Sequence, residues 1–418
     1  MLRIVEPSAK LLEFIRILNL PLSSPQLAHA IGFIDSLITL DERRSLARAN
    51  RLLGKPTDQS ALSDFFTYST WDEQAVRHAT QTALIDWMLS ERHKHPADMP
   101  ILLSIDDSLA KKPKTSHHFE PVEWHFDANG GRRYGHGLVF LTLHMEYGHR
   151  QAPINWRLYI REKTVRKLNR KKPLKKRLKF KTKLTLAIEA LEEVAPLLPD
   201  SVPVFVMSDS WYSADKHIRY CLKNHWDLIC ALKSNRLFNG KRLSHLARYS
   251  RNKSFYPVWI GSAANSTKYL VRARTGYLGS INHKVRVIAS KRHNRDKRPE
   301  HFLCTKSRLG TKKVLNRYSR RWADEIDHLY LKTRLGLEDF RIRSVEGITK
   351  YLALTFLSLA YLYWRQGNMP SPNEKKLSEV ISEHRAEHER KLLEHFGQEV
   401  LRLQSVDDAL RALFPEIV

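Results

Sequence analysis

The sequence predicts an α/β protein built on a mixed β-sheet. Short apolar runs typical of buried strands occur at residues 101–107, 202–209 and 226–233. The last two flank a helical segment, and this β-α-β order predicts that they pair in parallel. Two longer strand-like runs, 136–147 and 152–160, lie close together in the sequence, so an antiparallel meander is the simplest arrangement for them.

The segments around these strands divide the chain into five parts. Residues 1–98 carry apolar positions at helical spacing and are predicted to form a helical N-terminal domain, for which DNA-end recognition and a packing role are both open. The core is predicted in two parts, 99–235 and 311–370, with a β-rich insertion at 236–310 between them. Residues 371–418 are predicted to form a helical tail and are a candidate dimerisation element.

The charge of the chain points to a polyanionic partner. Lys and Arg number 71 against 44 for Asp and Glu, a formal net charge of +27. Nucleic acid is the usual partner of such an excess, and an anionic membrane surface is the alternative. The longest apolar run, Tyr351 to Trp364, is shorter than the roughly 20 residues that a membrane span needs, so it predicts a buried helix.

The N-terminus and the cysteines indicate where the protein works. No apolar signal-like stretch opens the chain, and Cys221, Cys230 and Cys304 form no CxxC pair. We therefore expect a cytoplasmic protein without a zinc site. With the basic charge added, a DNA- or RNA-facing protein is expected, and association with the nucleoid fits it. No GxxxxGK loop occurs, so no nucleotide cofactor is expected. The HxxEH pattern at 384–388 resembles a zinc-protease motif, but its neighbours are nearly all charged and predict a solvated helix face.

The stretch from Tyr318 to Lys332 is predicted to be one helix with a charged face. At about 100° per residue, Tyr318, Arg321, Glu325 and Lys332 fall within an arc of roughly 60°. One carboxylate flanked by cations suits a metal ion and a phosphate ester. The alternative is an exposed helix with solvated charges.

The most basic part of the chain is 161–183, with 13 basic residues against the single acid Glu162. It lies between a predicted strand and a predicted helix. Contact with a phosphate backbone is the preferred interpretation, and a disordered insert is the alternative. Such contacts cannot by themselves specify a DNA sequence.

Three acids stand out by position. Asp107 and Asp209 each end a predicted buried strand, and Glu325 lies on the charged helix face. Carboxylates arranged in this way can hold two divalent metal ions for phosphoryl transfer, and oxygen ligands suit Mg²⁺, with Mn²⁺ as a substitute. Helix capping is the competing role for Asp209.

The motifs resemble those of bacterial insertion-sequence transposases of the DDE kind, within the insertion-sequence-four grouping. The helix reads Tyr318-x2-Arg321-x3-Glu325-x6-Lys332, the signature of that grouping. SIDDS at 104–108 resembles the first Asp block, and MSDSWYSADKHI at 207–218 resembles the second. The resemblance spans about 57 to 366 and rests mainly on the helix signature, which is the most specific of these motifs.

The resemblance implies a ribonuclease H-like core and metal-dependent DNA cleavage and strand transfer at the terminal inverted repeats of a mobile element. By the same resemblance, Asp107, Asp209 and Glu325 bind the metals. Asp106 precedes Asp107, and only one of them can serve because successive strand residues face opposite ways. Asp107 is favoured because the family blocks place the ligand just before a small hydroxyl residue, here Ser108.

The resemblance also implies contacts with double-stranded DNA, both the transposon ends and the target. Trp259, the only Trp of the insertion, is a candidate for stacking on a flipped base, although a buried sheet position is the more ordinary role. A homodimer on DNA is expected, since two ends must be brought together. A catalytically inactive DNA-binding relative and a ribonuclease H-like nuclease are the alternative functions. The predicted DNA-binding residues are Tyr318, Arg321, Lys332, Lys171, Lys172, Lys175, Lys176, Arg177 and Trp259.

Overall fold

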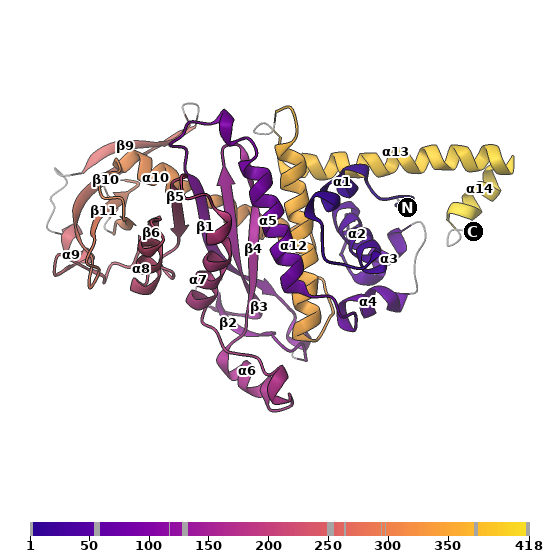
Figure 1. Ribbon diagram of the computed structural model, residues 1–418, viewed down its shortest axis with the longest axis horizontal. Coiled ribbons are helices and arrows are strands. Elements are labelled where there is room, and N and C mark those ends of the chain that lie inside the picture. The colour runs from indigo at the N-terminus through magenta and orange to yellow at the C-terminus, as the bar shows by residue number, and fades with distance from the viewer. Residues whose placement is uncertain are drawn as a thin grey trace.

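The computed structural model of the chain describes residues 3–53, 59–116, 118–127, 133–248, 255–262, 265–293, 295–296, 298–371 and 375–414. A large mixed sheet forms its centre, helices cover both faces, and a helical N-terminal part lies at one side (Figure 1). The strands are β1 (Ile101–Lys111), β2 (Glu123–Asp127), β3 (Arg133–Tyr147), β4 (Arg150–Tyr159), β5 (Val204–Ser208), β6 (Asp227–Leu232), β7 (Leu237–Phe238), β8 (Lys241–Arg242), β9 (Tyr256–Gly261), β10 (Ser266–Tyr277), β11 (Lys284–Lys291) and β12 (Glu300–Cys304).

The helices follow the same chain order. Short 3-10 turns η1 (Arg92–Lys94), η2 (Lys114–Ser116), η3 (Leu174–Lys176) and η4 (Ala195–Leu197) occur between them. The α-helices are α1 (Ala9–Leu18), α2 (Ser24–Thr39), α3 (Leu46–Leu52), α4 (Gln59–Thr67), α5 (Glu73–Leu89), α6 (Glu162–Asn169), α7 (Lys183–Val194), α8 (Asp215–Lys223), α9 (Leu243–Arg248), α10 (Thr311–Ser319), α11 (Trp322–Thr333), α12 (Val345–Gly367), α13 (Leu377–Leu403) and α14 (Val406–Leu413).

The middle of the sheet has the order β4-β3-β1-β5-β6. β1 pairs antiparallel with β3 and parallel with β5, and β5 pairs parallel with β6. The predicted hairpin of β3 and β4 and the predicted parallel pair β5 and β6 are both confirmed. This mixed sheet with flanking helices is consistent with a ribonuclease H-like fold.

The predicted β-rich insertion extends the central sheet. β12 pairs antiparallel with β6, and β11, β10 and β9 follow in that order. The first part of the core and the insertion therefore share one continuous backbone hydrogen-bond ladder. The insertion thus adjoins β6, whose other neighbour β5 is followed by Asp209.

Side chains alternate between the two faces of β1 and form two separate cores. Leu103 and Ile105 belong to the larger apolar cluster, which also includes α5, α7 and α12. Leu102 belongs to a smaller cluster with Phe205 and Met207 of β5 and with residues of α10. This alternation is the geometric origin of the active-site arrangement described below.

Helix α12 is the central support of the molecule. The predicted buried helix at Tyr351 to Trp364 is confirmed: α12 contacts β4 on one side and α2, α4 and α13 on others. Trp156 of β4 stacks on Phe356 with ring centroids 5.1 Å apart. Among the described residues no helix is long and apolar enough to cross a membrane.

The prediction of one helix from Tyr318 to Lys332 is wrong. α10 ends at Ser319, α11 begins at Trp322, and Arg320 and Arg321 form a tight joint between them. At this joint the backbone N–H of Arg321 bonds to the carbonyl of Tyr318, and that of Asp324 to the carbonyl of Arg321. These three-residue spacings tighten the winding, so the angles of a continuous α-helix do not apply across the joint.

The prediction of a solvated face at 384–388 is also wrong. His384 and His388 of α13 are fully buried and both contact Asp35 of α2, with Nε2 to Oδ1 distances of 2.6 and 2.8 Å. The second oxygen of Asp35 accepts a hydrogen bond from the backbone N–H of Ser8 (3.0 Å). Local charge density misled the prediction because the helix buries one stripe of an otherwise charged sequence against α2.

This cluster joins the N-terminal helices to the C-terminal part of the chain and predicts acid sensitivity. Burial acts to raise the pKa of Asp35, but hydrogen bonds from His384 and His388 outweigh this effect and lower it. Burial also lowers the pKa of His384. A lowered pKa means that the folded state holds fewer protons than the unfolded state, so stability is lost as pH falls below about 6.5, the ordinary value for His.

We expect Asp35→Asn to lower the free energy of unfolding at pH 7.5 by about 2–4 kcal/mol, because it removes the negative charge that both histidines contact. Urea unfolding at pH 7.5 and pH 5.5 measures both effects. Asp64→Asn, an exposed position of α4, is the matched control and should change stability by less than about 0.5 kcal/mol. Wild-type stability in Asp35→Asn would contradict the assignment.

Candidate active site

Asp106 and Asp107 lie in the middle of β1, which continues to Lys111, so the prediction that the strand ends at these acids is wrong. Their side chains point to opposite faces of the sheet. Asp107 contacts Lys183 at the start of α7, with Nζ 2.5 Å from Oδ2, and accepts a hydrogen bond from the Tyr212 hydroxyl at 2.6 Å. Both oxygens of Asp107 are thus held by protein groups on that face.

Asp106 faces α11 and is linked to Glu325 through Arg321. One guanidinium nitrogen of Arg321 donates to Asp106 Oδ2 and the other to Glu325 Oε1, each at 2.9 Å. Arg321 is mostly buried and the Glu325 side chain is 40 % exposed. The acid of β1 that shares a cation with Glu325 is therefore Asp106, whereas the sequence favoured Asp107.

Asp209 follows the last residue of β5, as predicted. The β1–β5 register ends at the pair of Ile105 with Ser208, so Asp209 lies just beyond it, close to both Asp106 and Asp107. Asp209 Oδ1 accepts a hydrogen bond from the backbone N–H of Trp211 at 2.8 Å. The helix-capping role does not apply, because the N-cap of α8 is Ala214. Asp209 stabilises the turn that leaves β5.

The electrostatics of this group favour a cation. Burial raises the pKa of Asp106 to about 7, with Asp209 and Asp107 adding to the rise and Arg321 opposing it. Burial also raises the pKa of Asp209, again with a contribution from Asp107. Neighbouring buried carboxylates repel one another when all of them are ionised. A bound divalent metal ion stabilises their ionised forms. The donor set of carboxylate oxygens suits Mg²⁺ or Mn²⁺.

The other residues of the predicted helix face lie at different depths. Lys332 donates from Nζ to the Ser108 hydroxyl of β1 at 2.5 Å. The Tyr318 ring packs edge-on against Phe302 of β12, with ring centroids 4.7 Å apart, and burial raises its pKa to about 12. Tyr318 thus belongs in part to the smaller core.

Behind α11 lies a buried polar layer that the sequence analysis missed. Asp324 accepts from the Ser104 hydroxyl at 3.0 Å, and burial, with Asp106 nearby, raises its pKa well above the ordinary value. Asp327 contacts His144 Nδ1 at 2.6 Å and accepts from the Tyr363 hydroxyl at 2.7 Å. One pattern in the sequence could have revealed this layer: Ser104 and Asp106 lie two residues apart in one strand, so both side chains face the same helix.

Among the residues that the structure describes, two buried groups contain enough His and carboxylate ligands to hold a metal ion: Asp35 with His384 and His388, and His144 with Asp324 and Asp327. Neither includes Asp106, Asp209 or Glu325. In the first group Arg365 donates to His384 Nδ1 (3.2 Å), so the ring proton lies on Nε2 and is directed to Asp35. Hydrogen bonding alone accounts for the His384–Asp35 contact.

The predicted DNA-binding residues outside the helix are surface residues. Lys171, Lys175, Lys176 and Arg177 are exposed and Lys172 is half-buried. Trp259 of β9 is 48 % exposed, so the expectation of a buried sheet tryptophan is wrong. The Lys268 ammonium lies 5.7 Å from its ring centroid.

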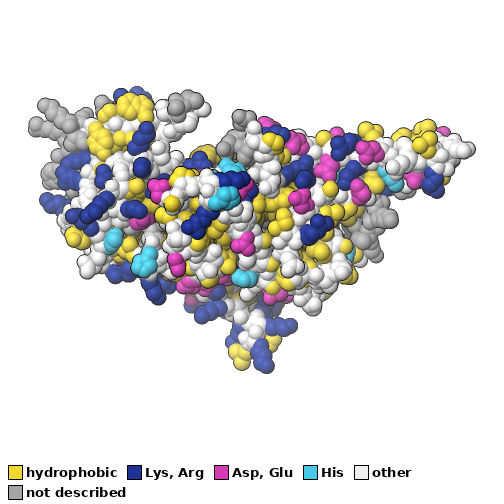
Figure 2. All heavy atoms as spheres, turned by 45° about the horizontal axis from the view of Figure 1, so that its top comes forward, with side chains coloured by type: hydrophobic (Ala, Val, Ile, Leu, Met, Phe, Trp, Pro, Cys, Tyr) yellow, Lys and Arg dark blue, Asp and Glu magenta, His cyan; other side chains and the backbone are white. Residues whose placement is uncertain are grey.

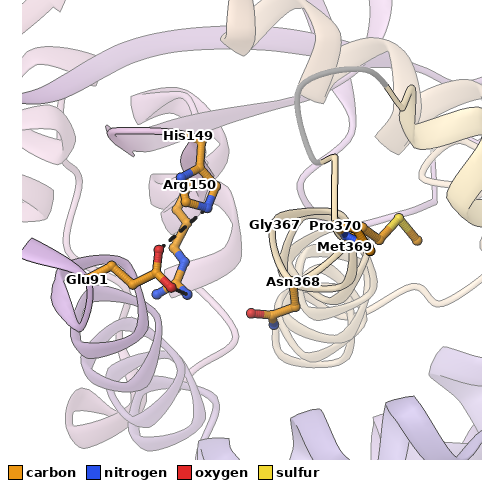
Figure 3. A pocket seen from close by; sticks show the side chains of 7 residues that line it. All are labelled: Glu91, His149, Arg150, Gly367, Asn368, Met369 and Pro370. Carbon is orange, nitrogen blue, oxygen red and sulfur yellow. Dashed lines mark ion pairs between the residues drawn. The ribbon is translucent and has the colours of Figure 1, made fainter. Parts of the chain in front are cut away.

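A separate pocket lies at the end of α5, the β3–β4 turn and the end of α12 (Figure 3). Arg150 and Glu91 form an ion pair at 3.0 Å within it, and His149 lies 3.8 Å from the same carboxylate. None of the three candidate acids lines it.

Residues 23–254, more than half of the 418, match the family model described as DDE superfamily endonuclease. The chain belongs to this family. A second family model, described as transposase DDE domain, matches residues 181–361. The first match contains Asp106 and Asp209 and the second contains Asp209 and Glu325. A search of curated proteins gives no match. The protein is a DNA-binding, nucleic-acid-cleaving enzyme of the transposase type.

Substitutions at the two adjacent acids are expected to affect stability in opposite directions. Because the folded state raises the pKa of Asp106 to about 7, ionising it costs stability as pH rises from about 4 to 7. In metal-free protein at pH 8, Asp106→Asn should be more stable than wild type by about 1–2 kcal/mol. Asp107→Asn should be less stable by about 1–2 kcal/mol, because it weakens the contacts with Lys183 and Tyr212.

Thermal unfolding of the two variants beside wild type in the presence of a chelator measures the difference. Repeating the measurement at pH 5 is the control, since the advantage of Asp106→Asn should shrink there. Equal destabilisation by both substitutions at pH 8 would contradict the distinction between them.

Proposed function

We propose that this DDE endonuclease is a transposase of the insertion-sequence-four grouping that cleaves and joins DNA at the terminal inverted repeats of its own element, at the nucleoid. The observation that carries the proposal is that Arg321 joins Asp106 to Glu325, while Asp209 lies close to Asp106. In the free protein, the Arg321 guanidinium already lies between Asp106 and Glu325.

We propose Asp106, in place of Asp107, as the first metal ligand, together with Asp209 and Glu325. Asp107 is already held by Lys183 and Tyr212 on the opposite face, and a ligand there would have to break both contacts. When bound, divalent metal ions activate the attacking water or 3′-hydroxyl and stabilise the leaving oxygen.

The residues of the chain have distinct tasks in this proposal. Arg321 holds Asp106 and Glu325 together in the free protein and binds a DNA phosphate once the acids hold metal. Lys332, tied to Ser108 two residues beyond Asp106, provides a second cation for the DNA backbone. Lys183 orients Asp107 and keeps it from competing for the metal.

Synapsis of two DNA ends calls for two active sites, and we propose a homodimer formed through the C-terminal helices. α13 runs for 27 residues, and its distal part extends away from the body of the molecule and contacts α14 (Figure 1). Leu393 and Leu401 on this part are 70 % and 81 % exposed. A second copy of the chain would cover these apolar side chains.

Metal-dependent nicking of duplex DNA carrying the element's ends tests the function. With Mg²⁺ or Mn²⁺, we expect Asp106→Asn, Asp209→Asn and Glu325→Gln each to lower the cleavage rate by about a thousandfold or more, while DNA affinity stays within about threefold. Asp107→Asn should retain cleavage within about tenfold, because it does not touch the metals. Asp64→Asn is the surface control.

Three outcomes would contradict this assignment. Full activity of Asp106→Asn with loss in Asp107→Asn would reverse the first ligand. Sequence-specific footprints without cleavage under any metal would indicate an inactive DNA-binding protein. Preferential cleavage of RNA–DNA hybrids over DNA with defined ends would indicate a nuclease of another kind.

A further inference from the structure

The basic segment between β4 and α7 contains a closed loop. The Asn169 side chain spans its base: Oδ1 accepts from the backbone N–H of Leu178, and Nδ2 donates to the carbonyl of Leu178, both at 2.8 Å. Inside the loop, the N–H groups of Lys176 and Arg177 bond to the carbonyls of Pro173 and Leu174. The loop therefore has a defined shape instead of being a disordered insert.

All charged residues of this loop are cations. Six of the eight residues at 170–177 are Lys or Arg, and the other two are Pro173 and Leu174. Leu174 follows Pro173 at the start of the short turn η3 and is 77 % exposed. Single exposed leucines are common on protein surfaces. This one differs because it occupies the turn of a preformed loop and cations flank it on both sides.

The loop stands on α6, which is anchored to the sheet. Thr164 and Lys163 of α6 both contact the carboxylate of Glu123 on β2, and Val165 is buried. α6 and the loop project from the body of the molecule (Figure 1), and the projection carries Lys and Arg around an apolar end (Figure 2). A rigid base and a projecting end allow the loop to reach a partner that the body does not contact.

The other end of this segment reaches the candidate active site. Lys183, the first residue of α7, contacts Asp107, the neighbour of Asp106 on β1. Lys179 and Lys181 lie between Lys183 and the loop, so basic residues continue along the chain from the candidate active site to the projection. Charge complementarity thus favours the DNA backbone as the partner of the six cations.

We propose that the loop of residues 169–178 inserts Leu174 between base pairs of the DNA bound at the active site and bends the duplex there. Apolar side chains presented by basic elements act in this way on DNA, where they unstack one base step and kink the helix. The six cations hold the flanking phosphates while Pro173 and the Asn169 clasp keep Leu174 at the apex. This inference rests on the proposed DNA-cleaving function and adds to it a wedge that deforms the substrate.

The test compares two 30-base-pair duplexes of one sequence, fully paired or with a central mismatch, bound by the full chain in a chelator to prevent cleavage. A wedge gains affinity where the bases are already unstacked, so wild type should bind the mismatched duplex about tenfold more tightly. Leu174→Ala should reduce this preference to less than about twofold, and Leu174→Met should keep it. A 2-aminopurine beside the mismatch should brighten with wild type and not with Leu174→Ala.

Two control variants distinguish the effect of the Leu174 side chain from the effect of the cations around it. Lys175→Ala with Lys176→Ala should weaken binding to both duplexes alike and lower the salt dependence by about two released ions, with the preference unchanged. Ile17→Ala, an exposed aliphatic position on α1, should change nothing.

Equal wild-type affinity for the two duplexes, or an undiminished preference in Leu174→Ala, would overturn the wedge. So would Leu174-dependent binding to anionic vesicles with no Leu174 effect on DNA, which would assign the loop to a membrane surface. Metal-dependent cleavage by Leu174→Ala in either of these cases would leave the proposed function standing. Conversely, the wild-type chain could cleave no DNA under any metal and still prefer the mismatched duplex. That result would contradict the proposed function and leave the wedge standing.

Discussion

The alternation of side chains along β1 is the constraint on which the site depends. A strand presents successive residues to opposite faces, so Asp106 and Asp107 enter different environments although they are neighbours in sequence. One face meets α11 and its arginine, and the other meets α7 and the turn after β5. Asp209, the first residue after β5, lies close to both acids of β1. A one-residue register slip would exchange the two acids and separate Glu325 from its partners.

The acids are held close together by buried cations and hydroxyls. Burial raises the pKa of Asp106 and of Asp209, and Asp107 adds to the rise at both. Arg321 offsets part of this cost by contacting Asp106 and Glu325 together. The polar layer behind α11, with Asp327 between His144 and Tyr363, fixes the helix against β3. The free protein therefore holds its carboxylates in a preformed arrangement, and their raised pKa values are typical of a functional site.

The surrounding architecture supports this arrangement from behind and carries two projections. The insertion strands continue the central sheet through β12, and α12 passes behind β4 as a buried support. The cluster of Asp35 with His384 and His388 ties the N-terminal helices to α13. From this body the basic loop on α6 and the distal half of α13 extend outward (Figure 1). The two projections are thus mounted on a body whose sheet and buried helix also support the candidate site.

The sequence by itself determined the fold class, the parallel and antiparallel strand pairs and the buried helix at Tyr351 to Trp364. It also indicated the three regions that contain the candidate acids. These features depend on local periodicity and chain order. Tertiary structure decided which of two adjacent aspartates faces Glu325, since both alternatives satisfy the same local pattern. It also decided that the helix breaks at Arg320 and Arg321, that His384 and His388 are buried and that Trp259 is exposed. Each of these depends on which surface packs against a distant segment, and that information is absent from any short window of sequence.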